Sequence, residues 1–416
     1  MTEKIKALKC RECGKTYSPG KQAICEECFG PLDVVYNYEA LELNRGSFRG
    51  KGRTLWRYMD LLPIEDPINV VELNAGWTPL HQSRRLAGLL GLSRLYVKND
   101  SVNPTGSFKD RPATVAVSKA LELKINAVGC PSTGNLAAAT AAHAAKANLP
   151  CYVLMPYDVE PVKVAQAAAY GARIISIRGT YDDANRLAAQ LSERYGWAFV
   201  NMDLRPYYVE GSKTLAFEVC EQLDWDPPDH VIVPMASGAL LCAVHRGFKE
   251  LAKIGLIPER TVKVTGVQPE GCAPIVKAYR SNQTHITPLG KPSTIAKSLA
   301  IGEPGDGIYA NRSMRESGGT AVSVSDEEIV DGIRLLASKE GIFTEPAGGV
   351  TIAALKRLLE SNAVSRDERV VCYVTGNGLK TIEALESSLL RPHVVEPKLE
   401  ALETVLEVKA QCQQSP

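Results

Sequence analysis

From residue 76 onward, short apolar runs alternate regularly with helical patterns. The apolar runs, which are candidate strands, cover residues 95–99, 126–131, 151–156, 173–179, 197–201, 230–235, 262–268 and 369–376. Helical patterns lie between them, at residues 136–148, 182–196, 212–223 and 351–360. Apolar strands spaced by helices are typical of parallel sheets that are buried on both faces. The sequence therefore predicts an α/β fold.

Four loops in this pattern have unusual compositions. They are SVNPTGSFKDRPA (101–113), PSTGNLAAAT (131–140), PMASGALL (234–241) and VTGNGLK (374–380). Parallel sheets bind ligands beyond the carboxyl ends of their strands, where such loops lead into helices. Small residues let backbone N–H groups approach an anion, and a helix N-terminus adds positive partial charge. Together the loops predict an anion-binding site at the mouth of the sheet.

The first of these loops contains an isolated lysine, Lys109, directly before Asp110 and Arg111. One interpretation is an ordinary helix start, capped by Thr105 or Ser107, with the lysine as a solvated charge. The other is a reactive amine, because a neutral lysine is a good nucleophile. The presence of the other three loops favours the reactive amine.

The first 28 residues contain four cysteines in the pattern C-x2-C-x11-C-x2-C: Cys10, Cys13, Cys25 and Cys28. Two such pairs can complete a tetrahedral shell of thiolates, most often around zinc, although iron is an alternative. A closed shell leaves no open coordination position, so we expect a structural metal. A zinc ribbon can also bind DNA or protein, which leaves a non-enzymatic role for this segment open.

The charge balance argues against a nucleic-acid or membrane partner. The 416 residues include 48 Lys and Arg against 47 Asp and Glu, so the positive and negative charges nearly cancel. The chain therefore has no strong electrostatic field that would attract a nucleic acid or a membrane surface. The sequence has no apolar run near the roughly 18 residues that span a bilayer and no hydrophobic signal core near its first residue. The scattered cysteines suit a reducing compartment, so we expect a cytoplasmic protein.

Two further patterns suggest functions but are weak. The segment EGSKT (210–214) resembles a nucleotide-binding loop, yet Ser212 separates the glycine from the lysine and the earlier glycine is missing. His143, His230 and His245 show no metal-ligand spacing. We interpret these histidines as packing or surface residues.

The motifs PTGSFKDR, PSTGN, EPAGGVTIAALK and TGNGLK, with the small-residue loop after VIVP, resemble those of fold-type II pyridoxal-phosphate enzymes, and specifically of threonine synthases. The resemblance runs from about residue 70 to 385, and the zinc-ribbon-like segment extends it. It implies a tryptophan synthase β-like fold with two parallel-sheet α/β domains. The expected divisions are a ribbon (1–38), a large cofactor domain (39–105 and 212–395), a smaller mobile domain (106–211) and a tail (396–416).

The resemblance also implies site residues. Lys109 would hold the cofactor covalently, Asn135 would bond its ring hydroxyl, and Thr375 would face its pyridine nitrogen. Ser132 and Thr133 would hold the carboxylate or phosphate of the substrate. The cofactor phosphate would lie on the backbone N–H groups of Ala236, Ser237, Gly238, Ala239 and Leu240.

The implied reaction is conversion of O-phospho-L-homoserine and water to L-threonine and phosphate, by β,γ-elimination and replacement. The alternative is a serine or threonine dehydratase, or a β-replacement enzyme that acts on an O-activated serine. A third reading is a binding protein in which the zinc ribbon sits on an inactive enzyme scaffold. A homodimer is possible under each of these readings.

One segment departs from the family pattern. Many threonine synthases have Asn-Ser-x-Asn-Pro-x-Arg before Glu-Gly-x-Lys-Thr, and those polar residues hold the substrate phosphate. Here Met202 and Asp203 replace Asn and Ser, Arg205 replaces the second Asn, and Tyr208 stands in place of the arginine. We expect Arg205 to bind the phosphate instead, because a guanidinium can grip it in a bidentate fork. The alternative is that Arg205 pairs with Asp203 or Glu210.

Overall fold

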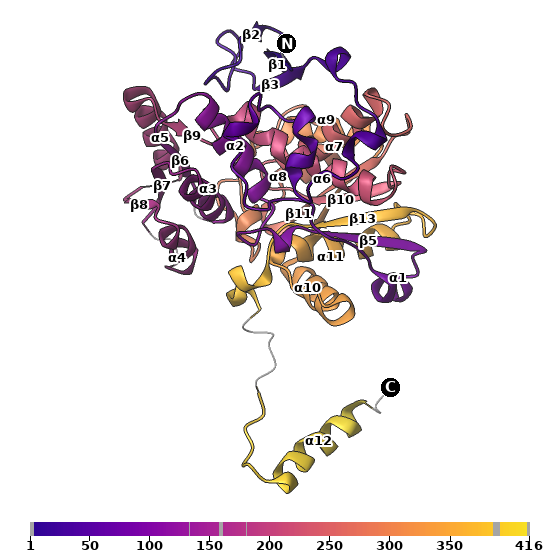
Figure 1. The fold of residues 1–416 in the computed structure, drawn as a ribbon. Helices are drawn as coiled ribbons and strands as arrows, with labels where there is room; N and C mark the ends of the chain where they lie inside the picture. Colours follow the sequence, from indigo (N-terminus) through magenta and orange to yellow (C-terminus); the bar gives the residue numbers. More distant parts are fainter. Residues whose placement is uncertain (1–3, 133, 158–160, 180, 386–391, 414–416) are drawn as a thin grey trace.

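The computed structural model describes residues 4–413 except 133, 158–160, 180 and 386–391. In this part of the chain the strands form three sheets (Figure 1). The first lies at the N-terminal end and is antiparallel, in the order β2-β1-β3. Its strands are β1 (Ile5–Cys10), β2 (Thr16–Tyr17) and β3 (Leu32–Tyr36).

The largest sheet has six strands in the order β12-β11-β10-β13-β5-β4. They are β4 (Leu80–Gln82), β5 (Arg94–Asn99), β10 (His230–Pro234), β11 (Lys263–Pro269), β12 (Ala321–Val324) and β13 (Arg369–Val374). All pairs are parallel except the short edge strand β4, which runs antiparallel to β5. The fold is thus the predicted α/β class, with one antiparallel strand that the pattern did not reveal.

Helices cover both faces of this sheet. They are α1 (Arg84–Leu90), α6 (Arg205–Gln222), α7 (Ala239–Lys253), α8 (Pro274–Arg280), α9 (Gly307–Glu316), α10 (Asp326–Glu340) and α11 (Pro346–Glu360). Along β10, Val231 and Val233 join one apolar core while Ile232 joins the other. Both faces of the strand are therefore buried, which explains its continuous apolar run.

The smaller parallel sheet has the order β8-β7-β6-β9. Its strands are β6 (Val128–Pro131), β7 (Cys151–Pro156), β8 (Arg173–Ile177) and β9 (Ala198–Phe199). Helices α3 (Asn135–Lys146), α4 (Pro161–Ala169) and α5 (Tyr181–Tyr195) belong to it. Helix α2 (Asp110–Glu122) packs between α3 and α6, and so connects the two parallel sheets.

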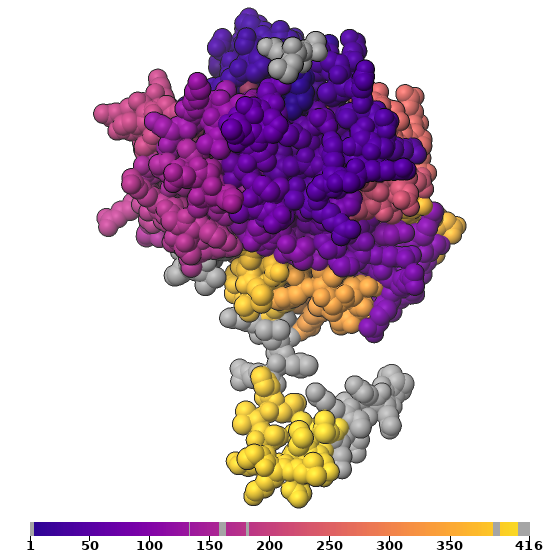
Figure 2. Space-filling view, viewed as in Figure 1, coloured from indigo at the N-terminus to yellow at the C-terminus, as the bar shows by residue number. Residues whose placement is uncertain are grey.

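Helix α12 (Leu399–Gln413) lies apart from the rest of the described chain, as Figures 1 and 2 show. In the described residues, no helix has both the length and the apolar character needed to cross a membrane.

Candidate active site

The sheet order places three of the four unusual loops side by side. Strands β10, β13 and β5 are parallel neighbours in the largest sheet. The loops that follow them, residues 236–240, 375–380 and 100–109, therefore open at one edge of the sheet, where ligands bind in this fold class. The fourth loop follows β6 of the smaller sheet and leads into α3.

Backbone hydrogen bonds join the lysine loop to the loop after β13. The N–H of Phe108 donates to the carbonyl of Thr375 at 2.8 Å, and the N–H of Asn377 donates to the carbonyl of Gly106 at 2.9 Å. Gly106 has a φ of +77°, in the left-handed region that favours glycine. These bonds hold Lys109 at the mouth of the sheet, as the sequence predicts.

The side chain of Lys109 ends against Tyr208 of α6. Its Nζ lies 2.9 Å from the Tyr208 hydroxyl and 4.7 Å from the centre of the Phe108 ring. The sequence pattern identified Tyr208 only as a departure from the family and missed this contact. A usable signal was Pro206, because proline is favoured in the first turn of a helix and would have extended α6 back over Tyr208.

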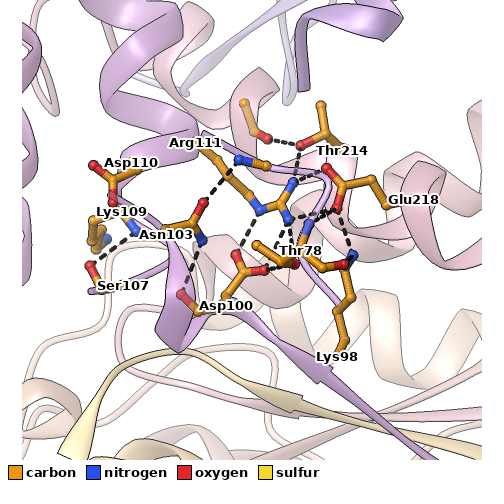
Figure 3. A network of polar contacts seen from close by, with 12 residues as sticks. Thr78, Lys98, Asp100, Asn103, Ser107, Lys109, Asp110, Arg111, Thr214 and Glu218 are labelled. Carbon is orange, nitrogen blue, oxygen red and sulfur yellow. Dashed lines mark hydrogen bonds and ion pairs between the residues drawn. The ribbon is translucent and has the colours of Figure 1, made fainter. Parts of the chain in front are cut away.

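Two residues after Lys109, the fully buried Arg111 fixes the start of α2 in a charge network (Figure 3). Its guanidinium donates to Asp100 at 2.6 and 2.9 Å and to Glu218 at 2.8 Å, and Lys98 donates to Glu218 at 2.6 Å. Burial alone would raise the pKa of Glu218, but the charges of Arg111 and Lys98 outweigh it and lower this pKa to about 2. Removing any one member would leave an uncompensated buried charge.

Asp110, next to the lysine, is held from two sides. One carboxylate oxygen accepts hydrogen bonds from the N–H and hydroxyl of Thr105, both at 2.9 Å. The other lies 3.2 Å from Nε2 of His143, which is fully buried on α3. His143 therefore packs as the sequence predicts, but it also ties α3 to the lysine loop.

The loop after β10 can accept a phosphate group. Gly238 has a φ of +95°, and a Cβ at this position would lie 2.9 Å from the carbonyl oxygen of Asp306. Helix α7 begins at Ala239, and the first N–H groups of a helix have no partner within the helix. This tight, small-residue helix start fits the phosphate of pyridoxal phosphate. We call the five residues Ala236, Ser237, Gly238, Ala239 and Leu240 the phosphate cradle.

The start of α3 reaches the largest sheet through Asn135. Its Nδ2 donates to the two carboxylate oxygens of Glu345 at 3.1 and 3.0 Å. Its expected bond to a cofactor hydroxyl stays a prediction, as does the placement of the buried Thr375 against the ring nitrogen. Ser132 directly follows β6, between that strand and α3, as expected, whereas Thr133 lies outside the described residues.

Arg205 begins α6 and pairs with Asp306, not with either acid considered from the sequence. The carboxylate of Asp203 instead accepts hydrogen bonds from the backbone of Phe199 and from Ser192, both at 2.8 Å. Within the described residues, Nη1 of Arg205 is a buried donor without a hydrogen-bond partner. This nitrogen could donate to an anion.

The four N-terminal cysteines come together as the spacing predicts. Their sulfur atoms all lie within 4.8 Å of one another. The Sγ atoms of Cys10 and Cys28 are 3.4 Å apart, and those of Cys13 and Cys25 are 3.6 Å apart. Zinc–sulfur bonds of about 2.3 Å in a tetrahedron place the sulfurs roughly 3.8 Å apart, so this arrangement fits a single zinc ion.

Comparisons with known proteins show which family this chain belongs to. Residues 71–376 match the family model described as pyridoxal-phosphate dependent enzyme. The chain is 42% identical to threonine synthase of Methanocaldococcus jannaschii, over 96% of this chain and 98% of that protein. It is also 42% identical to threonine synthase of Methanosarcina acetivorans, over 97% and 99%. The fold is similar to that of diaminopropionate ammonia lyase from Escherichia coli, with a TM-score of 0.66 and 22% identity over 78% of this chain and 94% of that one. This chain therefore belongs to the pyridoxal-phosphate-dependent enzyme family and, within it, to the threonine synthases.

Proposed function

We propose that this enzyme converts O-phospho-L-homoserine and water to L-threonine and phosphate, with pyridoxal phosphate bound to Lys109. The observation that carries the proposal is the 42% identity to two threonine synthases over almost the whole of each chain. The site supports it, because a lysine and a phosphate cradle follow two parallel strands, β5 and β10, that flank β13 in the largest sheet.

The bound cofactor supplies an electron sink for charge that develops on the substrate carbons. Once the substrate amine has replaced Lys109, the free lysine takes a proton from the α-carbon of the substrate. It then acts as the base and acid for the proton of the β-carbon. Phosphate leaves from the γ-carbon with the electrons of its C–O bond, and a proton taken from the β-carbon is delivered to the γ-carbon, which becomes the methyl group of threonine. Water then adds its hydroxyl to the β-carbon, and Lys109 returns a proton to the α-carbon. The Tyr208 hydroxyl, 2.9 Å from Nζ, keeps the amine in place between these transfers.

The substrate must be held while the lysine works. Ser132 and Thr133, which precede α3 in the sequence, are the expected partners of its carboxylate or phosphate. Closure of the segment 106–211 over the site would exclude water until it is needed, since premature water favours hydrolytic release of a keto acid.

Arg205 is the proposed partner of the substrate phosphate. Asp306 holds one end of its guanidinium, and the buried Nη1 supplies the remaining donor. Arg205→Ala should lower kcat/KM by the equivalent of about 2–5 kcal/mol, as for truncation of a buried charged partner. Arg205→Lys keeps the charge but loses the fork, so it should also be strongly impaired. Unchanged kcat/KM in Arg205→Ala would exclude this role.

The deciding experiment measures phosphate release from phosphohomoserine and identifies threonine as the product. Serine, threonine and phosphoserine are the comparison substrates, and faster turnover of any of them would favour the dehydratase or β-replacement reading. Lys109→Ala should abolish turnover, and borohydride reduction followed by peptide mapping should find the cofactor on Lys109. A label on Lys98 or Lys213 would contradict the assignment.

The remaining parts of the proposal concern the whole protein. We propose that the four-cysteine site binds one structural zinc, and that the enzyme is cytoplasmic. A homodimer is the assembly to test by sedimentation. If a chelator stopped catalysis at once and reversibly while the fold stayed intact, the metal would have to act in the reaction itself.

A further inference from the structure

The first cysteine pair lies against a helix of the largest sheet. We call residues 10–13, which include both cysteines of this pair, the metal knuckle. Within this segment, the guanidinium of Arg11 donates two hydrogen bonds, of 2.6 and 2.9 Å, to the carboxylate of Asp33 in β3. The same guanidinium lies 3.4 Å from the carboxylate of Asp306 and 4.5 Å from the centre of the Tyr309 ring. Arg11 therefore connects the ribbon to the start of α9.

The neighbouring knuckle residue makes a second contact with the same helix. The carboxylate of Glu12 accepts a hydrogen bond from Nη1 of Arg312 at 3.0 Å. Arg312 lies one turn after Tyr309 on α9, so Arg11 and Glu12 engage successive turns of one helix face. Both residues between the two metal ligands of the knuckle thus bind α9.

The start of α9 is in turn part of the wall of the phosphate cradle. The N–H of Asp306 donates to the carbonyl of Ser237 at 3.0 Å. Gly238 packs so closely that a Cβ there would lie 2.9 Å from the Asp306 carbonyl oxygen and 3.0 Å from Cβ of Ala310. A shift of the first turn of α9 would therefore change the shape of the cradle.

We propose that Arg11 and Glu12 are positioning residues that couple metal binding in the ribbon to cofactor binding in the phosphate cradle. The metal fixes the knuckle through its two flanking cysteines, the knuckle fixes the start of α9, and α9 fixes the cradle. Without the metal, these two side chains lose their anchored backbone and α9 loses two of its contacts. Because coupling free energy is reciprocal, cofactor binding must also increase metal affinity by the same factor. The inference rests on the proposed cofactor and metal, but not on the identity of the substrate.

The experiment titrates pyridoxal phosphate into the full chain and follows its absorbance, with no substrate present. In the wild type, removal of zinc should raise the cofactor Kd by about fivefold or more, the lower end of typical couplings. Zinc-loaded Arg11→Gln and Glu12→Gln should each bind the cofactor more weakly than the wild type. In the double variant, removal of zinc should change the Kd by less than about twofold, because the connection is already broken. Saturating cofactor should raise zinc affinity in the wild type but not in the double variant.

The matched control is Lys15→Gln. Lys15 is also charged and lies beside the first cysteine pair, but it pairs with Glu27 inside the ribbon, at 2.7 Å. This variant should keep the wild-type cofactor Kd and its dependence on zinc. Equal cofactor Kd values in the zinc-loaded wild type, Arg11→Gln and Glu12→Gln would overturn the proposal, even if the zinc-free protein aggregates. Because threonine formation is not the readout, a wrong substrate assignment would leave this result unaffected.

Discussion

Tyr208 is the residue whose role is most visible in the structure and least visible in the sequence. It is 6% exposed, and its hydroxyl is 2.9 Å from the amine of Lys109. Tyr208→Phe keeps the ring and removes only this hydrogen bond. A hydrogen bond to a charged group contributes about 1.5–3 kcal/mol, so kcat should fall roughly 10- to 150-fold while KM changes little. Steady-state kinetics would measure kcat and KM separately, and thermal unfolding would serve as the control for a loss of stability.

The neighbouring residue provides a control for that prediction. The hydroxyl of Tyr207 donates to the carbonyl of Gly20 at 3.0 Å and accepts from its N–H at 2.8 Å, in the ribbon. Tyr207→Phe therefore loses a similar hydroxyl in the same helix without touching the lysine. It should lower stability and leave kcat close to that of the wild type. A similar fall of kcat in both variants would mean that the hydroxyl of Tyr208 has no specific role.

The sequence could predict those residues whose role depends on the chain near them. The four cysteines come together because their spacing alone forms two knuckles, and Gly238 stands directly before α7, in the short loop after β10. The partner of Arg205 could not be predicted in this way. Asp306 is 101 residues away, and only the packing of α9 on the cradle brings it to α6.

Among the elements, α6 differs most from its expected form. The helical pattern indicates residues 212–223, whereas α6 covers Arg205–Gln222. Glu210, Gly211 and Ser212 are all buried, so this turn of the helix lacks the polar face that amphipathic periodicity requires. A helix that is buried all round gives no clear periodic signal, which is why its first turns were not recognised.

Gly211 allows this buried part of α6 to contact α2. A Cβ at Gly211 would lie 2.2 Å from the carbonyl oxygen of Arg111, so the two helix backbones meet directly. Gly211→Ala should force α6 and α2 apart and destabilise the protein by about 1–3 kcal/mol or more. It should also lower kcat, since the helices carry Tyr208 and Lys109. Urea unfolding and steady-state kinetics would measure the two effects.

A second helical glycine shows what the same change does without this contact. Gly88 lies in α1, and an added Cβ there would have no heavy atom within 4 Å outside the helix itself. Because alanine is the better helix former by about 1 kcal/mol, Gly88→Ala should be neutral or slightly stabilising. If Gly211→Ala behaved like Gly88→Ala, the close contact of α6 with α2 would not be a determinant of the fold.

At the scale of the whole molecule, the order of strands explains what the sequence could not predict. Most strands of the two larger sheets are local features that appear as apolar runs in the sequence, whereas β4 and β12 were not among the candidate strands. Their order, with the late strand β13 between β10 and the early β5, depends on long-range packing. The sequence indicated four separate loops, and this order is what brings three of them to one edge.

Among the polar contacts that connect elements of the smaller sheet to loops of the largest one, two bear on the proposed closure. One is Asn135 to Glu345. In the other, Lys380 of the short helix η8 (Gly378–Lys380) donates to the carbonyl of Thr105 at 2.6 Å and to Oε1 of Gln166 in α4 at 2.9 Å. Any movement of the smaller sheet relative to the larger one must either break these hydrogen bonds or move both of their partners together.

A substitution of Lys380 tests whether this second contact holds the smaller sheet in place. Lys380→Met keeps most of the half-buried side chain but removes the donor, so α4 loses its bond to the loop after β13. Backbone amides of α4 should then exchange with solvent deuterium about tenfold faster in the protein without ligand, since each tenfold change corresponds to about 1.4 kcal/mol of opening free energy. The control is Lys356→Met, which removes an exposed lysine of α11 and should leave exchange in α4 unchanged. If exchange in α4 were the same in both variants and in the wild type, Lys380 would not restrain the smaller sheet, and closure would depend on other contacts such as that of Asn135.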